Sequence, residues 1–416
     1  MNVKSGSGLV LCVCCFLLLF SNGCSYKGHL ATQNFAGLYK PDQQLNGLSY
    51  AVFNANDSIS FLYYRFPVEN LKFKKVAGKA AFASYKLDYK VFDGYKKGVL
   101  IDSGSRVGVD SVLLTGMFTD SIQLRTATGR NYIIQVNFSD LNSELTFPRL
   151  IDLPKLSHGL SSDYLLTDAY NKPLMRNWIS RAEKVRIRTR FPVNAAFNLM
   201  RYDFTDKTAA KSPYSFSAEE KTDEIDSGNE ININSHESLT EPFNLVDEGI
   251  FLKGQSKEKL KIFRFYDGFP KIGSANTMRE SLRYISTDEE VLEMMSMPAK
   301  AAVDNFWIGL TGNSERALSQ IKRYYSRIES ANELFSVSGE GWLSDRGMVY
   351  IVFGPPNIVY RNAEVEEWTY GEPGNALSVR FYFHPIQNSI GIEDYKLLRL
   401  EEYRRPWHLA VSNWRR

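Results

Sequence analysis

All four cysteines of this 416-residue chain lie within its first 24 residues, at Cys12, Cys14, Cys15 and Cys24. The first three fall inside the apolar run Leu9–Phe20, which is too short to span a membrane. Because Lys4 precedes this run and Ser21-Asn22-Gly23 follows it, we predict that residues 1–23 are an export signal peptide. The exported body must then fold without a disulfide, on its hydrophobic core alone.

The cysteine that closes the string LLLFSNGC, Cys24, resembles the acylated acceptor cysteine of bacterial lipoproteins. Ser21 stands three positions before the cysteine, where Leu is usual, and this departure is seen in lipoproteins of the Bacteroidetes type. The alternative to a lipoprotein signal is a plain secretory signal with an incidental cysteine. Ser25, where an Asp would retain the protein at the inner membrane, favours the outer membrane. The stretch SYKGH lacks the acidic surface-export signal, so we expect a palmitate-type anchor at Cys24 and a periplasm-facing position, with surface exposure left open.

The composition of the chain limits which classes of partner we expect the protein to bind. The formal net charge of +3 is too small for a dedicated polyanion binder, so we expect no nucleic acid. Nothing after residue 24 approaches 18 consecutive apolar residues, which leaves the lipid as the expected membrane attachment. With no thiol left after lipidation and no pair of histidines four positions apart, we predict neither a metal nor a cofactor.

The pattern along the chain predicts a mostly β protein with a mixed C-terminal domain. Residues 24–45 are polar, which is typical of a tether. Residues 46–150 alternate apolar and polar side chains, as in Ala81, Ala83 and Tyr85, and turn residues such as Ser103-Gly104-Ser105 interrupt the runs. Short alternating strands of this kind indicate an antiparallel β-sandwich.

A second β-rich domain is predicted over residues 151–273. Arg186, Arg188 and Arg190 alternate with apolar residues, so one face of that strand is basic, either as a solvated face or as a surface for an anionic ligand. Within this domain, residues 215–242 hold eight acidic residues and few large apolar ones. Such a stretch buries too little surface to offset the entropy of ordering it, so we predict a long mobile loop there.

Residues 274–416 change to helical spacing and end in a small antiparallel sheet. Thr287 and Glu290 form a capping-box pattern, and Asn313 or Ser314 caps a helix that continues to Phe335. The other face of that helix is basic, at Arg316, Lys322, Arg323 and Arg327, which indicates either a solvated face or a lipid-docking face.

The densest signal is the string GWLSDRGMVYIVFGPP at residues 341–356. We expect Gly341 to place Trp342 against a core and Asp345-Arg346-Gly347 to form a turn. Met348–Phe353 is apolar on both faces, which predicts a central strand, and Gly354-Pro355 ends it.

With the motif GWLSDRG and FGPP, the chain resembles the GWxTD-domain family of bacterial envelope proteins. The resemblance also includes LRYIS at residues 282–286, Phe306-Trp307, Glu367-Trp368 and the string DYKL at 394–397, and it covers roughly residues 276–405. Ser344 replaces the family's Thr and keeps the hydroxyl. The resemblance implies a class and an envelope location; it implies no reaction.

We therefore predict a lipid-anchored, non-enzymatic structural or assembly component that contacts other envelope proteins. The motif residues Gly341, Trp342, Ser344, Asp345, Arg346, Gly347, Gly354 and Pro355 are then architecture or an interaction surface. One alternative is a hydrolase of envelope glycan or peptide that uses Asp345 with a Glu of residues 364–367. Nucleophilic catalysis by Ser344 would instead need a base, and His384 could approach Ser344 only if the neighbouring strands pair suitably.

A second alternative is a glycan-binding module with exposed aromatics such as Tyr360 or Trp368. The Arg- and Trp-containing tail from Arg404 to Arg416 either docks on a membrane or partner, or folds back onto the domain.

Overall fold

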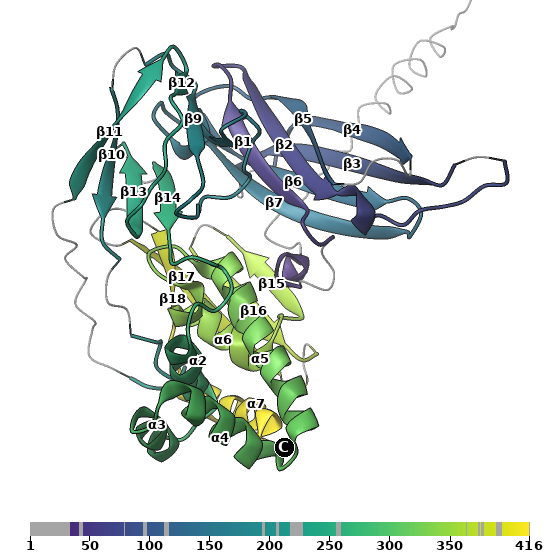
Figure 1. Cartoon of the computed structure of the whole chain (residues 1–416). Helices are drawn as coiled ribbons and strands as arrows, with labels where there is room; N and C mark the ends of the chain where they lie inside the picture. Colours follow the sequence, from purple (N-terminus) through teal and green to yellow (C-terminus); the bar gives the residue numbers. More distant parts are fainter. Residues whose placement is uncertain are drawn as a thin grey trace, which may run out of the picture.

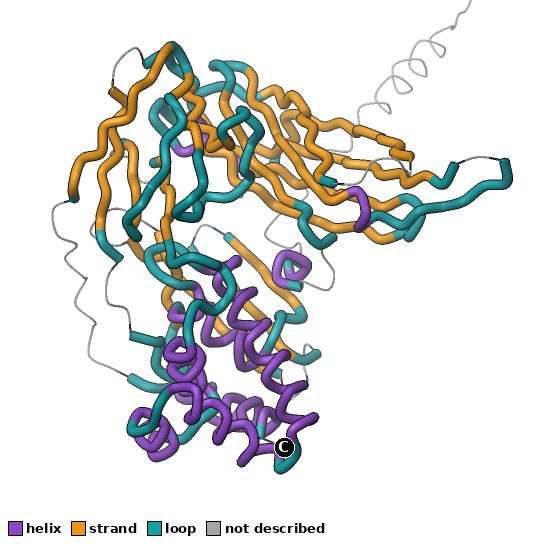
Figure 2. Tube along the Cα trace, in the orientation of Figure 1, coloured by secondary structure: helices purple, strands orange, loops and turns teal. Residues whose placement is uncertain are grey.

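In a computed structural model of the chain, two β bodies lie side by side above a mostly helical part (Figure 1). The structure describes residues 34–40, 45–78, 80–94, 98–111, 116–193, 196–204, 208–216, 228–254, 259–362, 364–372, 375, 378–387 and 393–415. The predicted signal peptide and the lipidation site Cys24 lie outside the described residues. Figure 2 shows that strands fill both upper bodies, whereas the helices gather below around one small sheet. This arrangement confirms the predicted mostly β fold with a mixed C-terminal part.

The first body is an antiparallel β-sandwich, as its period-two pattern predicts. One sheet has the order β1-β2-β5, with β1 (Ser49–Asn54), β2 (Ile59–Pro67) and β5 (Met117–Arg125). The other has the order β4-β3-β6-β7, with β4 (Leu100–Ser111), β3 (Phe82–Asp93), β6 (Arg130–Asp140) and β7 (Leu145–Lys155). Inward side chains such as Tyr64, Leu87 and Phe138 are buried between the sheets.

The predicted turn at Ser103-Gly104-Ser105 is wrong, because these residues lie inside β4. Gly104 pairs with Tyr89, and a Cβ on Gly104 would come within 2.7 Å of the Tyr89 ring. The glycine therefore makes room for a cross-strand aromatic ring and does not mark a turn.

The second body is a seven-stranded sheet of order β14-β13-β10-β11-β12-β9-β8. Its strands are β8 (Tyr164–Asp168), β9 (Val185–Thr189), β10 (Ala196–Tyr202), β11 (Asn229–His236), β12 (Leu239–Thr240), β13 (Gly249–Lys253) and β14 (Leu260–Arg264). The loop predicted over residues 215–242 is therefore too long, because β11 and β12 lie within it. Ile231 and Ile233 pack against the core of this sheet, while five of the eight acidic residues fall in 217–227, outside the described residues.

A buried polar junction joins the two β bodies. The Asn54 amide donates to Asp163 Oδ1 at 2.9 Å and to Ser162 Oγ at 2.8 Å. Arg190 donates to Asp163 at 3.1 Å and to Asp57 at 2.5 Å, with its side chain only 2% exposed. Of the three arginines predicted on one strand face, Arg190 thus serves the contact between the bodies and is not part of a solvated face.

Lys155 is fully buried beside this junction. Its ammonium donates to the carbonyl of Ile59 and to the hydroxyls of Ser60 and Thr126, each at 3.1 Å. Burial lowers the pKa of Lys155 to about 8.

The C-terminal part packs helices on a four-stranded sheet. The helices are α2 (Ala275–Ser281), α3 (Asp288–Met295), α4 (Ala299–Thr311), α5 (Ser314–Phe335), α6 (Asp345–Phe353) and α7 (Arg404–Trp414). The sheet has the order β15-β16-β17-β18, with β15 (Ile358–Arg361), β16 (Glu366–Tyr370), β17 (Val379–Gln387) and β18 (Glu393–Leu397). The capping box of Thr287 with Glu290 and the Asn313 cap are both present, as predicted.

The central strand predicted over Met348–Phe353 is wrong, because these residues belong to helix α6. Every residue from Asp345 to Val352 is buried, so the helix has no polar face to reveal its period. A short apolar run enclosed on all sides has the same sequence pattern in a helix as in a central strand. The predicted turn Asp345-Arg346-Gly347 is the first turn of this helix.

The C-terminal tail folds back onto the domain as helix α7. Trp407 and Trp414 are 5% and 3% exposed and belong to the main core of the C-terminal part. Arg323 and Arg327 of α5 each lie 4.8 Å from the centre of the Trp414 ring. Part of the basic face predicted on α5 therefore packs on α7.

The predicted tether is wrong for residues 34–39, which we call the strap. The strap includes the 3₁₀ helix η2 (Ala36–Tyr39) and packs into the core of the C-terminal part. Phe35 N donates to Val359 O of β15 at 2.8 Å, and the Asn34 side chain accepts from Val359 N at 2.9 Å. Phe35, Leu38 and Tyr39 are buried, so a short apolar cluster within a polar stretch fixes this segment to a sheet edge.

Candidate functional site

The GWLSD motif forms the start of helix α6. The 3₁₀ helix η7 (Gly341–Leu343) leads into the helix, and Ser344 is its N-cap. The Ser344 hydroxyl accepts from Gly347 N at 3.0 Å and donates to Gly341 O at 2.7 Å. A cap of this kind stabilises a helix by about 1 kcal/mol, and the family's Thr could do the same. Ser344 is therefore used as a structural hydroxyl.

Both glycines of the motif are required by close backbone packing. A Cβ on Gly341 would lie 2.0 Å from Ala331 O of helix α5, and a Cβ on Gly347 would lie 2.0 Å from Gly341 O. No side chain fits at either position without moving the backbone. The two glycines thus let α5, η7 and α6 approach each other directly.

Trp342 is 2% exposed, as the architectural interpretation of the motif requires. Its indole N–H donates to Glu340 at 3.0 Å, and its carbonyl accepts from the Tyr284 hydroxyl at 2.8 Å. Glu340 also accepts from the Tyr266 hydroxyl at 3.2 Å, which ties the motif to the segment after β14. Burial raises the pKa of Glu340, although both hydrogen bonds act in the opposite direction.

Asp345 joins helix α6 to the end of the sheet. Its Oδ2 accepts from Leu397 N of β18 at 2.8 Å, and its Oδ1 accepts from Arg399 at 2.5 Å. Arg399 also donates to the carbonyls of Lys211 and Ser212, which belong to the loop after β10. Asp345 therefore connects three segments that are distant in the sequence.

Arg346 lies between aromatic rings. Its guanidinium is 4.1 Å from the centre of the Tyr395 ring and 5.1 Å from that of Phe335, and the residue is 6% exposed. Arg346 also makes a long-range ion pair, with 3.9 Å between Arg346 Nη1 and Glu366 Oε1. A desolvated cation–π contact is worth about 2 kcal/mol, so Arg346 is a packing residue as much as an ionic one.

Glu366 is the fully buried carboxylate of this region. It accepts from the hydroxyl of Tyr39 in the strap and from the Trp368 indole, both at 2.7 Å, and Arg361 Nε lies 2.8 Å away. Burial alone would raise its pKa, but Arg361, Arg346 and the two hydrogen bonds hold the pKa of Glu366 below its usual value. The site thus keeps an ionised carboxylate at the meeting point of strap, sheet and α6.

Gly354 and Pro355 end helix α6, whereas the sequence predicted that they end a strand. Gly354 adopts a φ of 85°, a conformation that favours glycine, and its carbonyl accepts from the Tyr370 hydroxyl at 2.8 Å. Pro355 follows in the turn that leads to β15.

The carboxylates and the base of the hydrolase hypothesis have other partners. Asp345 and Glu366 are each paired with arginine, and no raised pKa marks Glu366 as a general acid. The His384 ring contacts the carbonyl of Glu364 at 3.0 Å, and the Ser344 hydroxyl is engaged in its helix cap. Trp368, named in the glycan-binding hypothesis, is fully buried, whereas Tyr360 is 37% exposed.

Sequence reasoning found the motif, and the string DYKL already included Tyr395. It missed Tyr39, Arg361 and Arg399, and it gave Glu366 only a catalytic role. One signal was available for Glu366, which alternates with Trp368 and Tyr370 and so must face the same core as they do. The others are brought in by tertiary packing and carry no local pattern.

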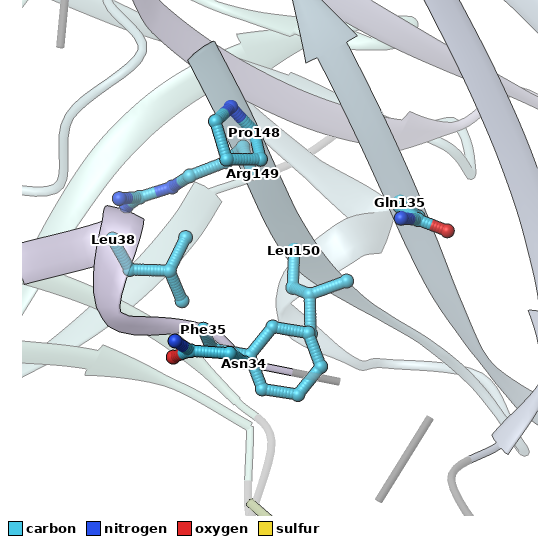
Figure 3. Close-up of a pocket in the computed structure, with 7 residues that line it drawn as sticks. All are labelled: Asn34, Phe35, Leu38, Gln135, Pro148, Arg149 and Leu150. Atoms are coloured by element: carbon cyan, nitrogen blue, oxygen red, sulfur yellow. The ribbon is translucent and has the colours of Figure 1, made fainter. Parts of the chain in front are cut away.

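A crevice beside the strap is too small to be a ligand site. Figure 3 shows Phe35 and Leu38 of the strap facing Pro148, Arg149 and Leu150 of β7. The space between them is about 10 Å³, room for one water. The strap is thus packed against the sandwich as well as against β15.

Among the residues that the structure describes, no three His, Cys, Asp or Glu side chains are grouped so that they could hold a metal ion. Within the same residues, no helix has the length and apolar content needed to cross a membrane.

Residues 250–416 match the family model of the GWxTD domain. The match begins within β13, earlier than the resemblance in the sequence suggested. No curated protein matches the chain significantly.

Among solved structures, similar chains include Bacteroides uniformis beta-glucuronidase, the same organism's beta-glucuronidase 2 with a covalently bound cyclophellitol-6-carboxylate aziridine, and a calcium-binding mutant of beta-glucuronidase 2. The identities are 11%, 10% and 12%; each match covers 34% of this chain but only 17% of the other chain, with a TM-score of 0.19. Similarity at this level supports no statement about activity.

Proposed function

Residues 250–416 of this chain form a GWxTD domain, and we propose that this domain makes the protein a non-catalytic structural or assembly component of the cell envelope. The observation that supports the proposal most is that the polar groups of the motif are engaged in contacts within the fold. Ser344 caps a helix, Asp345 holds Leu397 and Arg399, and Arg346 is enclosed by aromatic rings. Groups that are consumed by internal contacts organise a fold, and they are not available to a substrate.

The contacts between the GWxTD domain and the rest of the chain support a scaffold. The strap binds β15 and Glu366, and the loop after β10 donates Ala210 N to Leu343 O at 3.1 Å. Within residues 250–416, the Tyr266 hydroxyl donates to Glu340 at 3.2 Å and the Asn332 amide donates to Pro270 O at 3.1 Å, which joins the segment after β14 to the helices. The motif and its neighbours thus hold the two β bodies in one orientation, as an assembly component needs.

In this proposal the protein is anchored by lipid at Cys24, in the outer membrane and facing the periplasm. The strap begins ten positions after Cys24, a distance that an extended chain spans in at most about 35 Å. Because the strap is fixed to β15, the GWxTD domain would be held close to the membrane surface. Two or three acyl chains, at about 0.8 kcal/mol per buried CH₂, would make this attachment effectively permanent.

Photo-crosslinking in intact cells tests the proposal. A photoreactive amino acid is placed at Tyr170, which is 85% exposed, and at Leu318, which is 67% exposed. We expect both positions to capture defined envelope proteins and a Cys24→Ala variant to leave the membrane fraction and to lose them. The proposal fails if no envelope protein is captured from any exposed position. It also fails if the purified protein cleaves envelope glycan or peptide and a folded Asp345→Asn variant does not.

A further inference from the structure

The GWxTD domain has a groove on the side where α7 crosses α5 and α6. We call it the arginine groove, because Arg323 and Arg327 of α5 line it together with Phe353, Val379, Leu409 and Trp414. Its volume is about 320 Å³, within the range of sites for small organic ligands. None of the motif residues Gly341–Gly347 lines it, so the groove is separate from the site described above.

The two guanidinium groups of the groove lie over one indole ring. Each is 4.8 Å from the centre of the Trp414 ring, and that ring is fixed by its own hydrogen bond to Val352 O at 3.0 Å. Burial, and then the neighbouring charge of Arg323, lower the pKa of Arg327 to about 10. Two cations are thus held side by side on a rigid surface.

The positive charge is only half compensated. Arg327 donates to Ile351 O at 2.9 Å and Val352 O at 3.2 Å, at the carbonyl end of helix α6, where the helix dipole favours a cation. Among the described residues, the Arg323 guanidinium has the indole face but no hydrogen-bond acceptor of this kind. Across the described part of the chain, no carboxylate lies within 4.0 Å of either guanidinium. The carbonyls occupy donors of Arg327 and offset part of its charge, so Arg323 is the more available cation for an anionic ligand.

The lining of the groove beyond the arginines includes Tyr370 and Asn413, and it is otherwise formed mainly by apolar side chains. Phe353 and Val379 form a wall, and Leu409 on α7 is 48% exposed at the rim. A ligand that fits both features has one anionic group and an apolar body. A planar carboxylate carries one charge and matches the fork of an arginine, whereas a phosphate dianion carries two charges and Arg327 already uses donors on two carbonyls.

We propose that the arginine groove binds an amphipathic carboxylate, with its carboxylate on Arg323 and Arg327 and its apolar body along Phe353, Val379 and Leu409. This inference is independent of the proposed scaffold function, because it involves neither the motif nor the lipid anchor.

Isothermal titration calorimetry with octanoate tests the proposal on the mature chain carrying Cys24→Ser, which needs no detergent. We expect saturable binding of one octanoate per chain. Acetate lacks the apolar body and octanol lacks the negative charge, so each should bind at least about tenfold more weakly than octanoate. Octyl phosphate distinguishes a carboxylate site from a general anion site and should bind more weakly than octanoate.

The matched variants are Arg323→Ala and Arg316→Ala, which remove exposed arginines of the same helix inside and outside the groove. We expect Arg323→Ala to weaken octanoate binding by about tenfold or more and Arg316→Ala to leave it unchanged, with both proteins melting like the wild type. Absence of saturable binding to the wild type would overturn the proposal. Equal binding by the two variants, or tighter binding of octyl phosphate, would also overturn it.

Discussion

Glu366 shows how one buried residue couples distant parts of the chain. It is fully buried, yet it binds Tyr39 of the strap, Trp368 of its own strand and Arg361 of β15. A buried carboxylate is tolerated only when cations and donors replace the water it loses. Removing its charge takes from Arg346 its nearby carboxylate and leaves Arg361 with the more distant Asp152 at 3.9 Å, so Glu366 is a sensitive residue of the site.

We predict that Glu366→Gln lowers the free energy of unfolding by about 3–5 kcal/mol at pH 7. The folded-state pKa of Glu366 lies below the ordinary value of 4.5, so the unfolded chain binds the proton first. Its contribution is complete above about pH 4.5 and is lost as the pH falls through the folded-state value. The difference between wild type and variant, from urea unfolding, should therefore shrink as the pH falls below about 4.5. Glu293→Gln on the exposed side of α3 is the control, and a difference that stays constant with pH would contradict the account.

At the scale of elements, local signals predicted most of the fold. Alternation identified β3, and the Thr287 and Asn313 caps located α3 and α5. Helix α6 was mistaken for a strand because burial on all sides removes the helical period. The motif itself was recognisable, but its partners Arg399 and Tyr39 come from elements with no pattern of their own.

Helix α7 illustrates an element whose role only packing reveals. We predict that Trp407→Ala lowers the free energy of unfolding by about 3–5 kcal/mol, because it opens a cavity between α7 and the core. Leu409→Ala on the same helix, at a position 48% exposed, should change stability by less than about 0.5 kcal/mol. Urea unfolding of both variants checks this. A Trp407→Ala protein of normal stability would instead support a tail that docks elsewhere.

At the scale of the whole molecule, long-range polar contacts set how the bodies are arranged. Asn54, Asp163 and Arg190 fix the two β bodies to each other, and the strap fixes the N-terminal side to the GWxTD domain. Residues 24–45 have a composition typical of a tether, and the few apolar residues of the strap are too short a run to show any period. Sequence patterns therefore could not predict how the bodies are arranged.

We predict that Arg190→Ala loosens the junction between the β bodies and lowers stability by about 3–5 kcal/mol, because it leaves Asp163 buried without its cation. Arg188→Ala, two positions earlier on the same strand face, is the matched control and should be close to neutral. Small-angle X-ray scattering should show a larger radius of gyration for Arg190→Ala only. An unchanged radius together with unchanged stability would mean that other contacts hold the bodies.

The central claim is that the GWLSD motif stabilises the molecule, and Asp345→Asn tests it most directly. Asn keeps the size of the side chain but loses the charge that holds Arg399 and Leu397 N. The free energy of unfolding from urea titration should fall by about 1.5–3 kcal/mol. Asp288→Asn changes the matching first-turn residue of α3, which is exposed, and should cost less than about 1 kcal/mol. An Asp345→Asn protein as stable as the wild type would contradict the account.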